Sequence, residues 1–269
     1  MENPVVIIPG VLFYSYLSSQ RKEDVAFLEH NVLVLQVSGQ FTLETARQKI
    51  SLQKGQMLLI GKNQLGQITK MPLPGENYQT IVITLQEDFL RKVALEERIT
   101  VRQPYVGPRN ILVPVNDFLK GYFESVIPYA RNREANIPPA IGILKVKEAV
   151  ALLLHAMPAL SDLLFDFSEP HKIDLKKFML SNFYFNVPVT KFAELTGRSL
   201  AAFKRDFKTA FGMAPRHWLQ DKRLTEARHL IEKKNRKPSA IYLDLGFESL
   251  AHFSNSFKKK FGKSPTDWN

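Results

Sequence analysis

The sequence contains no cysteine among its 269 residues, and this absence removes several kinds of chemistry at once. Disulfide bonds, metal sites with thiolate ligands and catalysis by a thiol all need cysteine. The sequence also lacks a P-loop, a G-x-S-x-G segment and a dinucleotide-binding fingerprint. From these absences we expect neither an enzyme nor a cofactor.

Long apolar runs are missing as well. The apolar segment near the beginning, residues 5–13 (VVIIPGVLF), is interrupted by Pro9 and Gly10 and follows no basic leader. A membrane-spanning helix needs about 20 apolar residues, so this segment predicts strands around a turn. We expect no membrane partner, and the cytoplasm is the expected location.

Histidine is scarce, and its placement argues against a metal centre. Only His30 lies in a region expected to form strands, and no H-x-H pair with a following glutamate is present. A metal site needs several converging ligands, so we predict no metal. The six histidines are His30, His155, His171, His217, His229 and His252.

Excess acidic charge is absent, and the basic excess is confined to one end of the chain. Of the 37 Lys and Arg residues and the 26 Asp and Glu residues, 20 and 9 respectively lie in residues 171–269. That leaves 17 of each sign in residues 1–170, so the whole net charge of +11 belongs to the last third. A basic domain beside a neutral one predicts a module that binds a polyanion, either nucleic acid or an anionic membrane.

The basic region contains an internal repeat with a period of fifty residues. Residues 194–218 read ELTGRSLAAFKRDFKTAFGMAPRHW, and residues 244–268 read DLGFESLAHFSNSFKKKFGKSPTDW. The two segments align without a gap, which indicates a duplicated structural unit. Identical pairs include Leu195/Leu245, Ser199/Ser249, Leu200/Leu250, Ala201/Ala251, Phe203/Phe253, Phe207/Phe257, Lys208/Lys258, Phe211/Phe261, Gly212/Gly262, Pro215/Pro265 and Trp218/Trp268.

Each copy predicts a short helix, a tight turn and a longer helix, which is the helix-turn-helix arrangement. The short helix follows a proline and ends at a glycine, and a serine can then cap the longer helix. Phenylalanines recur every four residues along the longer helix and form one buried face, and a second glycine ends it. In the two copies these positions are Pro188 and Pro238, Gly197 and Gly246, Ser199 and Ser249, and Gly212 and Gly262.

A helical pattern from Pro215 to Lys234 joins the two copies. At about 1.5 Å per residue this helix would be a rod of roughly 30 Å. Successive major-groove openings on one face of DNA lie about 34 Å apart, so the two longer helices could enter adjacent segments of the groove. The apolar residues on one side of this helix are Leu224, Ala227, Leu230 and Ile231.

At these residues the sequence resembles the C-terminal domain of the AraC/XylS family of transcription regulators, over residues 172–269. The resemblance implies that this domain binds double-stranded promoter DNA and activates transcription through contacts with RNA polymerase. Two residues depart from the family pattern: Asn255 stands where arginine is frequent, and Tyr242 stands where alanine is usual. The second unit is therefore expected to dock more weakly, or to depend more on phosphates and DNA shape.

The positions opposite the phenylalanines are the candidates for contact with DNA. Arg205 is the strongest one, because its guanidinium fits guanine O6 and N7, and Asn255 could pair with adenine. Basic side chains near them could hold phosphates, which position a protein without reading sequence. The predicted DNA-binding residues are Arg198, Ala201, Lys204, Arg205, Lys208, Leu250, Ala251, Ser254, Asn255, Lys258, Lys259 and Lys260, with Arg216 and Lys263 as weaker candidates.

Residues 1–160 predict a second domain built mainly of strands. Short apolar or alternating runs are separated by turn signals such as Ser38-Gly39 and Lys54-Gly55, which is typical of a small barrel or sandwich. Residues 51–68 (SLQKGQMLLIGKNQLGQI) resemble a hairpin of the cupin-like sensor domain in the same family. The predicted fold class is therefore α+β, with an N-terminal cupin-like β-barrel and two helices, a linker at 161–171, and an all-α C-terminal domain with two helix-turn-helix units joined by a helix.

The two helices of the first domain are expected near Asn116–Arg131 and Pro139–Met157. One edge of the second helix mixes a leucine with polar groups at helical spacing, which suits either a solvated edge or a two-fold contact. Helices at this place often form the dimer contact in the family, so we expect a homodimer. The residues of this edge are Leu144, Lys145, Glu148, Leu152 and His155.

Two questions stay open at this stage. The barrel could enclose a small-molecule effector, or it could be filled and controlled by a protein partner or by expression level alone. A metal-dependent cupin enzyme fused to a non-specific DNA-binding domain is the alternative function, whereas a methyl-accepting DNA-repair protein is excluded because that chemistry needs cysteine. Candidate effector contacts are Phe13, Tyr14, Leu33, Leu35 and Tyr78.

Overall fold

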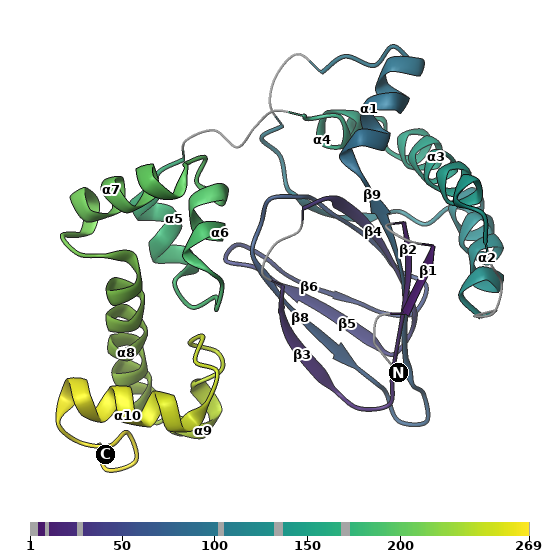
Figure 1. Cartoon of the computed structure of the whole chain (residues 1–269). Helices are drawn as coiled ribbons and strands as arrows, with labels where there is room; N and C mark the ends of the chain where they lie inside the picture. Colours follow the sequence, from purple (N-terminus) through teal and green to yellow (C-terminus); the bar gives the residue numbers. More distant parts are fainter. Residues whose placement is uncertain are drawn as a thin grey trace. The chain divides into compact units, whose positions relative to one another are not determined.

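The computed structural model describes residues 5–8, 11–25, 29–101, 105–131, 137–167 and 173–268. The chain divides between Ser168 and Glu169 into two compact units, each with its own elements (Figure 1). The N-terminal unit is rich in strands and the C-terminal unit is helical, as the predicted fold class states. No helix within the described ranges is both long enough and apolar enough to cross a membrane.

Two antiparallel sheets form most of the N-terminal unit. The larger sheet has the order β1-β2-β9-β4-β7-β10, and the smaller sheet has the order β3-β8-β5-β6. The strands of the larger sheet are β1 (Val5–Ile8), β2 (Leu12–Leu17), β9 (Tyr78–Leu85), β4 (Asn31–Ser38), β7 (Met57–Ile60) and β10 (Asn110–Val113). Those of the smaller sheet are β3 (Arg21–Val25), β8 (Gly66–Met71), β5 (Gln40–Glu44) and β6 (Lys49–Leu52).

The sheets do not close into the predicted barrel. Among the described strands, each ladder stays within one sheet, so each sheet keeps two edge strands. The chain passes from one sheet to the other at Gly39, whose φ of +77° is left-handed. A Cβ at Gly39 would come within 2.8 Å of the carbonyl oxygen of Met71, so only glycine fits this crossing. The cupin-like barrel is thus corrected to two facing sheets.

The larger sheet is buried on both of its faces. Val34 packs with Tyr78 in the core between the two sheets, whereas Leu33 and Leu35 pack in a second core beneath the helices. This division follows from strand geometry, because successive side chains point to opposite faces. The N-terminal unit is therefore a stack of three layers: helices, larger sheet and smaller sheet.

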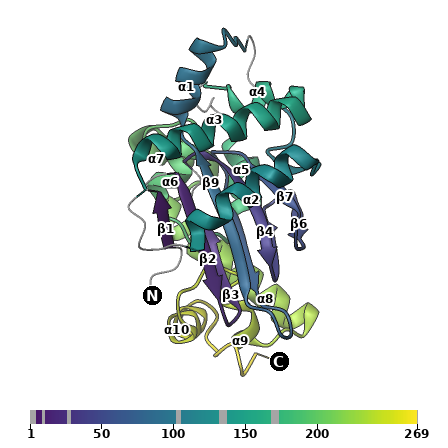
Figure 2. The ribbon, with the colours of Figure 1, turned by 90° about the vertical axis from the view of Figure 1, so that its right-hand side faces the viewer.

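Helices cover the outer face of the larger sheet, as Figure 2 shows for α2 and α3. The two predicted helices are confirmed as α2 (Asp117–Arg131) and α3 (Pro139–Ala156). Helix α1 (Glu87–Glu96) was not expected, and α4 (Ser161–Leu164) lies within the segment predicted as a linker. Because Leu163, Leu164 and Phe165 are buried in the N-terminal core, the linker begins later than residue 161, and residues 168–172 lie outside the described ranges.

The C-terminal unit contains the two predicted helix-turn-helix units. The first is α6 (Val189–Leu195) with α7 (Leu200–Phe211), and the second is α9 (Pro238–Ile241) with α10 (Leu250–Phe261). Helix α8 (Pro215–Lys234) joins them, and α5 (Leu175–Asn182) precedes them.

The two helix-turn-helix units have the same aromatic core. Phe203 and Phe207 are fully buried in the first unit, as are Phe253 and Phe257 in the second. A tryptophan closes each core, because Trp218 lies 5.5 Å from Phe207 and Trp268 lies 5.5 Å from Phe257, measured between ring centroids. The fifty-residue repeat therefore encodes one packing arrangement used twice.

Candidate nucleic-acid interface

The longer helices of the two units, α7 and α10, are held at both ends by the predicted caps. The hydroxyl of Ser199 accepts a hydrogen bond from the backbone N–H of Ala202, and that of Ser249 accepts one from His252, each at 3.2 Å. These bonds satisfy N–H groups that a helix start otherwise leaves free. Both helices end at a glycine with left-handed backbone, Gly212 or Gly262.

The turns before α7 and α10 have the same hydrogen-bond motif but differ in length. In both units a left-handed glycine is followed by an N–H that bonds back five residues, from Arg198 to Ala193 O and from Phe247 to Tyr242 O. This Schellman motif ends α6 in the first copy, whereas in the second copy it closes the turn that follows α9, which ends earlier than predicted, at Ile241. The glycine is Gly197 in one copy and Gly246 in the other, so the second turn is one residue longer, and Phe247 in it is buried.

The face of α7 and α10 that points away from the phenylalanines is open. It contains the side chains that the sequence nominated for contact with bases and with phosphates. Because Phe203, Phe207, Phe253 and Phe257 occupy the inner face, the polar and small residues between them are left outside. Of the nominated residues, Ala201, Lys204, Arg205, Lys208, Leu250, Ala251, Asn255, Lys258 and Lys259 are exposed, while Ser254, Arg198 and Lys260 are half-buried.

Among the charged side chains of α7 that form a described ion pair, Arg205 is the most exposed. Its side chain is 74% exposed, and its guanidinium makes a 3.3 Å contact with Asp206. The hydrogen bond from Arg198, together with contacts from Arg205, holds the pKa of the Asp206 carboxyl below its usual value. Asp206 therefore stays charged and pairs with both Arg198 and Arg205. Because Asp206 contacts one side of the Arg205 guanidinium, the exposed side is left for another partner.

Arg198 is placed differently from the other nominated residues. Its side chain is only 10% exposed, and it forms an ion pair with Asp206 at 3.1 Å. The guanidinium also donates to the carbonyl oxygens of Thr196 at 2.7 Å and Ile173 at 3.1 Å. These internal bonds tie the turn of the first unit to α7 and to the segment before α5, so Arg198 acts here as an internal brace.

The three lysines near the end of α10 divide into two kinds. Lys258 and Lys259 are exposed, whereas the side chain of Lys260 is only 24% exposed. The ammonium of Lys260 donates to Asp221 O and Thr225 Oγ1, both at 2.8 Å, and pairs with the Asp221 carboxylate. Lys260 therefore fastens α10 to α8, and the exposed Lys258 and Lys259 present positive charge at the surface.

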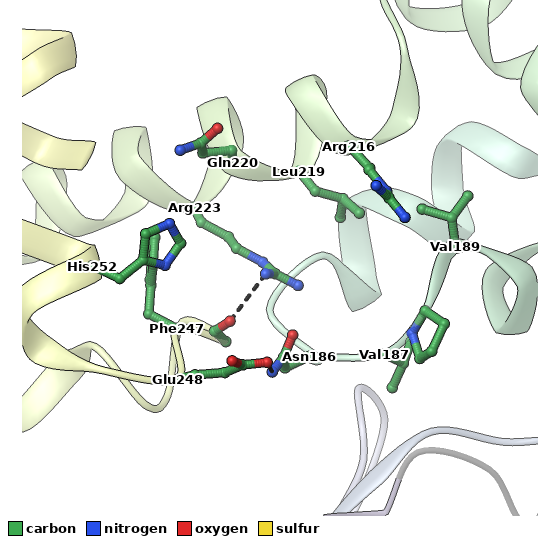
Figure 3. A pocket seen from close by; sticks show the side chains of 12 residues that line it. Asn186, Val187, Val189, Arg216, Leu219, Gln220, Arg223, Phe247, Glu248 and His252 are labelled. Atoms are coloured by element: carbon green, nitrogen blue, oxygen red, sulfur yellow. Dashed lines mark hydrogen bonds between the residues drawn. The ribbon is translucent and has the colours of Figure 1, made fainter. Parts of the chain in front are cut away.

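Within the C-terminal unit, a pocket of about 340 Å³ lies between the two helix-turn-helix units, against α8 (Figure 3). At its base, the Arg223 guanidinium donates to the carbonyl oxygens of Phe183, Phe185 and Gly246. Arg223 was not predicted as a functional residue, because nothing local in the sequence distinguishes it from its basic neighbours on α8. The lining residues come from the loop before α6 and the first residue of α6, from α8, from the turn before α10 and from α10 itself: Asn186, Val187, Pro188, Val189, Arg216, Leu219, Gln220, Arg223, Gly246, Phe247, Glu248 and His252.

The predicted dimer edge of α3 is partly open. Leu144 is 63% exposed, Glu148 and His155 are exposed, and Leu152 is half-buried against the helical core. Lys145 is mostly covered, because its ammonium bonds Ser125 Oγ at 2.7 Å and Glu148 at 2.9 Å.

Phe118 of α2 extends this edge. It is 63% exposed, and its ring lies 5.7 Å from that of His155 in an edge-to-face contact. Phe118 was not predicted to belong to this edge, because a phenylalanine on an amphipathic helix usually packs in the core.

The nominated effector contacts do not converge on one interior. Leu33, Leu35 and Tyr14 pack on the helix side of the larger sheet, whereas Tyr78 belongs to the core between the sheets. Phe13 is half-buried. In the described part of the chain, no three His, Asp or Glu side chains are arranged to hold a metal ion.

Comparison with known proteins gives matches to both the N-terminal and the C-terminal unit. The helix-turn-helix domain family matches residues 192–269, and the ExsA N-terminal regulatory domain family matches residues 31–162. The virulence regulon transcriptional activator VirF of Yersinia enterocolitica is 25% identical over 230 residues, which cover 80% of each chain. The HTH-type transcriptional regulator ExsA of Pseudomonas aeruginosa is 27% identical over 112 residues, 41% of this chain and 40% of ExsA. A solved structure of apo ToxT from Vibrio cholerae is 13% identical with a TM-score of 0.46 and covers 97% of each chain.

Proposed function

The chain belongs to the AraC/XylS family of DNA-binding transcription regulators, and from this premise we propose that it activates transcription by reading promoter DNA with both helix-turn-helix units. The observation that carries the proposal is the pair of capped helices, α7 and α10, with phenylalanines inside and polar side chains outside. The likeness to the activator VirF extends over both units and supports activation as the outcome.

The two reading helices have different chemistry on their open faces. On α7, Lys204, Arg205 and Lys208 are all exposed, so this helix suits guanine edges and phosphates. On α10, the exposed Asn255 suits adenine, while Leu250 and Ala251 suit thymine methyl groups. We propose that α7 contributes more of the affinity, and that Lys258 and Lys259 position α10 on the phosphates.

The N-terminal unit supplies regulation in this proposal. The open edge of α3, with Phe118 beside it, supports a homodimer that places two DNA-binding units on one promoter. A small molecule or a partner protein that binds this unit would change how the dimer engages DNA. Contact with RNA polymerase completes the activation step, and such a regulator works in the cytoplasm, where bacterial promoters are.

A selection from random duplex DNA tests the proposal. The full chain is mixed with the pool at two salt concentrations, and the bound DNA is sequenced. We expect a motif with two segments about ten base pairs apart, because the two helices enter successive major grooves. Arg205→Ala removes a side chain that fits guanine, so we expect one segment to lose its base preference.

Lys234→Ala is the matched control, because it removes one exposed positive charge from the end of α8 and leaves both reading helices intact. It should reproduce the wild-type motif. Salt-sensitive binding with no motif, for the wild-type chain, would instead mean that the basic unit binds DNA without reading its sequence.

A further inference from the structure

Arg223 lies where the two helix-turn-helix units meet. It belongs to α8, but its hydrogen bonds leave that helix in two directions. Nε donates to Phe183 O and Nη2 to Phe185 O, both at 2.8 Å, in the loop before the first unit. Nη1 donates to Gly246 O at 3.0 Å, in the turn of the second unit, and this bond is dashed in Figure 3. One rigid, planar group therefore joins three segments.

Gly246 makes this junction close. Its φ of +76° is left-handed, and a Cβ there would collide with the carbonyl oxygen of Tyr184. The same Cβ would lie 2.9 Å from Cζ of Arg223. Only glycine therefore lets the turn of the second unit rest directly on residues 183–185. The longer turn of the second copy is what places a glycine at this point, one position before the equivalent of Gly197.

Two further contacts secure the second unit in the same place. Asn186 Nδ2 donates to Glu248 Oε1 at 3.1 Å, which ties the loop before α6 to the turn before α10. Gln220 Nε2 donates to Ser256 Oγ at 3.2 Å, which ties α8 to α10. The second unit is thus held by its own turn as well as by the end of α8, and it cannot pivot freely about that helix.

We propose that Arg223 is a positioning residue that sets the separation and angle of α7 and α10, and thereby selects the spacing of the two DNA segments. The inference rests on the proposed function, since it needs both helices to read DNA. One base pair moves a segment by about 3.4 Å along the axis and turns it by roughly 35°. If the junction is rigid, α10 cannot move to follow the shifted segment. If the junction is loose, α10 can follow it, but affinity for DNA with the best spacing falls.

Lysine cannot replace arginine at this junction. Its ammonium is a compact point charge on a flexible stem, and it lacks the planar fork that reaches separated acceptors. Arg223→Lys therefore keeps the charge of the unit but loosens the junction. Gly246→Ala loosens it by another route, because the new Cβ must push the turn away from the carbonyl oxygen of Tyr184 and from the guanidinium, although residue 223 is still arginine.

The test measures binding of the full chain to duplexes in which the two selected segments are moved apart or together by one base pair. A duplex that contains only the segment bound by α7 measures the affinity of α7 for its segment, without a contribution from α10. For the wild-type chain we expect a one-base-pair change to cost about tenfold or more in affinity. For Arg223→Lys and Gly246→Ala we expect this penalty to shrink to about threefold or less, with affinity for the single segment unchanged.

Arg228→Lys is the matched control, because it is the same substitution on the same helix, at an exposed residue whose ion pair with Glu232 stays within α8. It should keep the wild-type spacing penalty. Asn186→Ala removes only one exposed hydrogen bond of the junction, so it provides a reduced form of the effect if the other two variants unfold.

The outcomes separate the two claims. If the wild-type chain selects a motif but Arg223→Lys, Gly246→Ala and Asn186→Ala all keep its spacing penalty, the inference is wrong and the proposed function stands. The inference is also wrong if the variants lose affinity for the single segment as much as for the pair. If the wild-type chain selects no motif, the proposed function fails and the inference fails with it.

Discussion

Arginine has two roles within the C-terminal unit, and the surroundings of each guanidinium decide which role it takes. Arg205 is exposed and touches only Asp206 among its described partners, so it is available to DNA. Arg198 and Arg223 donate to backbone carbonyl oxygens and are used inside the unit. All three are always charged, so hydrogen-bond partners rather than charge distinguish a reading residue from a bracing one.

We expect Arg198→Ala to change stability and not the salt dependence of DNA binding, and Lys208→Ala to do the reverse. Arg198→Ala leaves the carbonyl oxygens of Ile173 and Thr196 without their charged donor, so it should lower the free energy of unfolding by about 1–2 kcal/mol. It should leave the salt dependence of DNA binding unchanged. Lys208→Ala should leave stability nearly unchanged and reduce the slope of log affinity against log salt by about one.

Chemical unfolding and binding titrations at several salt concentrations check both variants. The contrary result, a smaller salt slope for Arg198→Ala at wild-type stability, would return Arg198 to the group of phosphate contacts.

The reading helices α7 and α10 are repeated elements whose ends are set by the same local bonds. Each starts at a serine that accepts from an N–H three residues on, and each ends at a left-handed glycine. The burial of two phenylalanines then fixes which side faces outward. The elements differ in the turn before them, which is one residue longer in the second unit and allows the contact of Gly246 with Tyr184.

Removing either serine cap should destabilise its unit by a similar amount. We expect Ser199→Ala and Ser249→Ala each to lower the free energy of unfolding by about 1 kcal/mol, because one helix N–H loses its acceptor. Tryptophan fluorescence measures this in the full chain, since both tryptophans, Trp218 and Trp268, pack on the phenylalanine cores of the C-terminal unit. Thr209→Ala, an exposed position on α7, is the control and should change stability by less than about 0.5 kcal/mol. Equal stability of the capless and control variants would contradict the role of the caps.

On the scale of the whole molecule, each unit has its own core, and the N-terminal unit offers an apolar edge that its own fold does not cover. Leu144 and Phe118 are each 63% exposed on α3 and α2, whereas Leu152 beside them is already half in the core. An exposed apolar edge among polar groups suits a contact between two copies of the chain. Leu144 is therefore a cleaner probe of this edge than Leu152, because it is mostly exposed and does not belong to the helical core.

We expect Leu144→Asp to raise the dimer dissociation constant by about tenfold or more, because a carboxylate would be buried in the contact. Sedimentation velocity over a range of concentrations measures the shift. Leu95→Asp is the matched control, because Leu95 of α1 is 82% exposed and lies on another helix. An unchanged dissociation constant for Leu144→Asp, or an equal rise for Leu95→Asp, would exclude this edge as the contact.

The sequence by itself determined the two longer helices of the C-terminal unit and the helix that joins the two copies, but it did not predict α5. The fifty-residue repeat, the serine caps, the terminal glycines and the four-residue spacing of phenylalanine are all local signals, and each acts within one or two helical turns. For that reason the boundaries and the open faces of α7 and α10 could be predicted. The helices α2 and α3 were predictable on the same grounds, from apolar spacing and length.

Only the tertiary structure decided how strands and charged side chains are used. Strands were visible near residues 5–13 and within residues 31–84, whereas β3 and β10 were not predicted. Whether the sheets close depends on pairings between distant strands, and so does the face that receives Leu33 or Tyr78. Arg198, Lys260 and Arg223 look like free basic residues in the sequence, yet each finds acceptors that lie about 20 to 40 residues away. Hydrogen bonds over such separations leave no local pattern, because partner and donor meet only when the chain has folded.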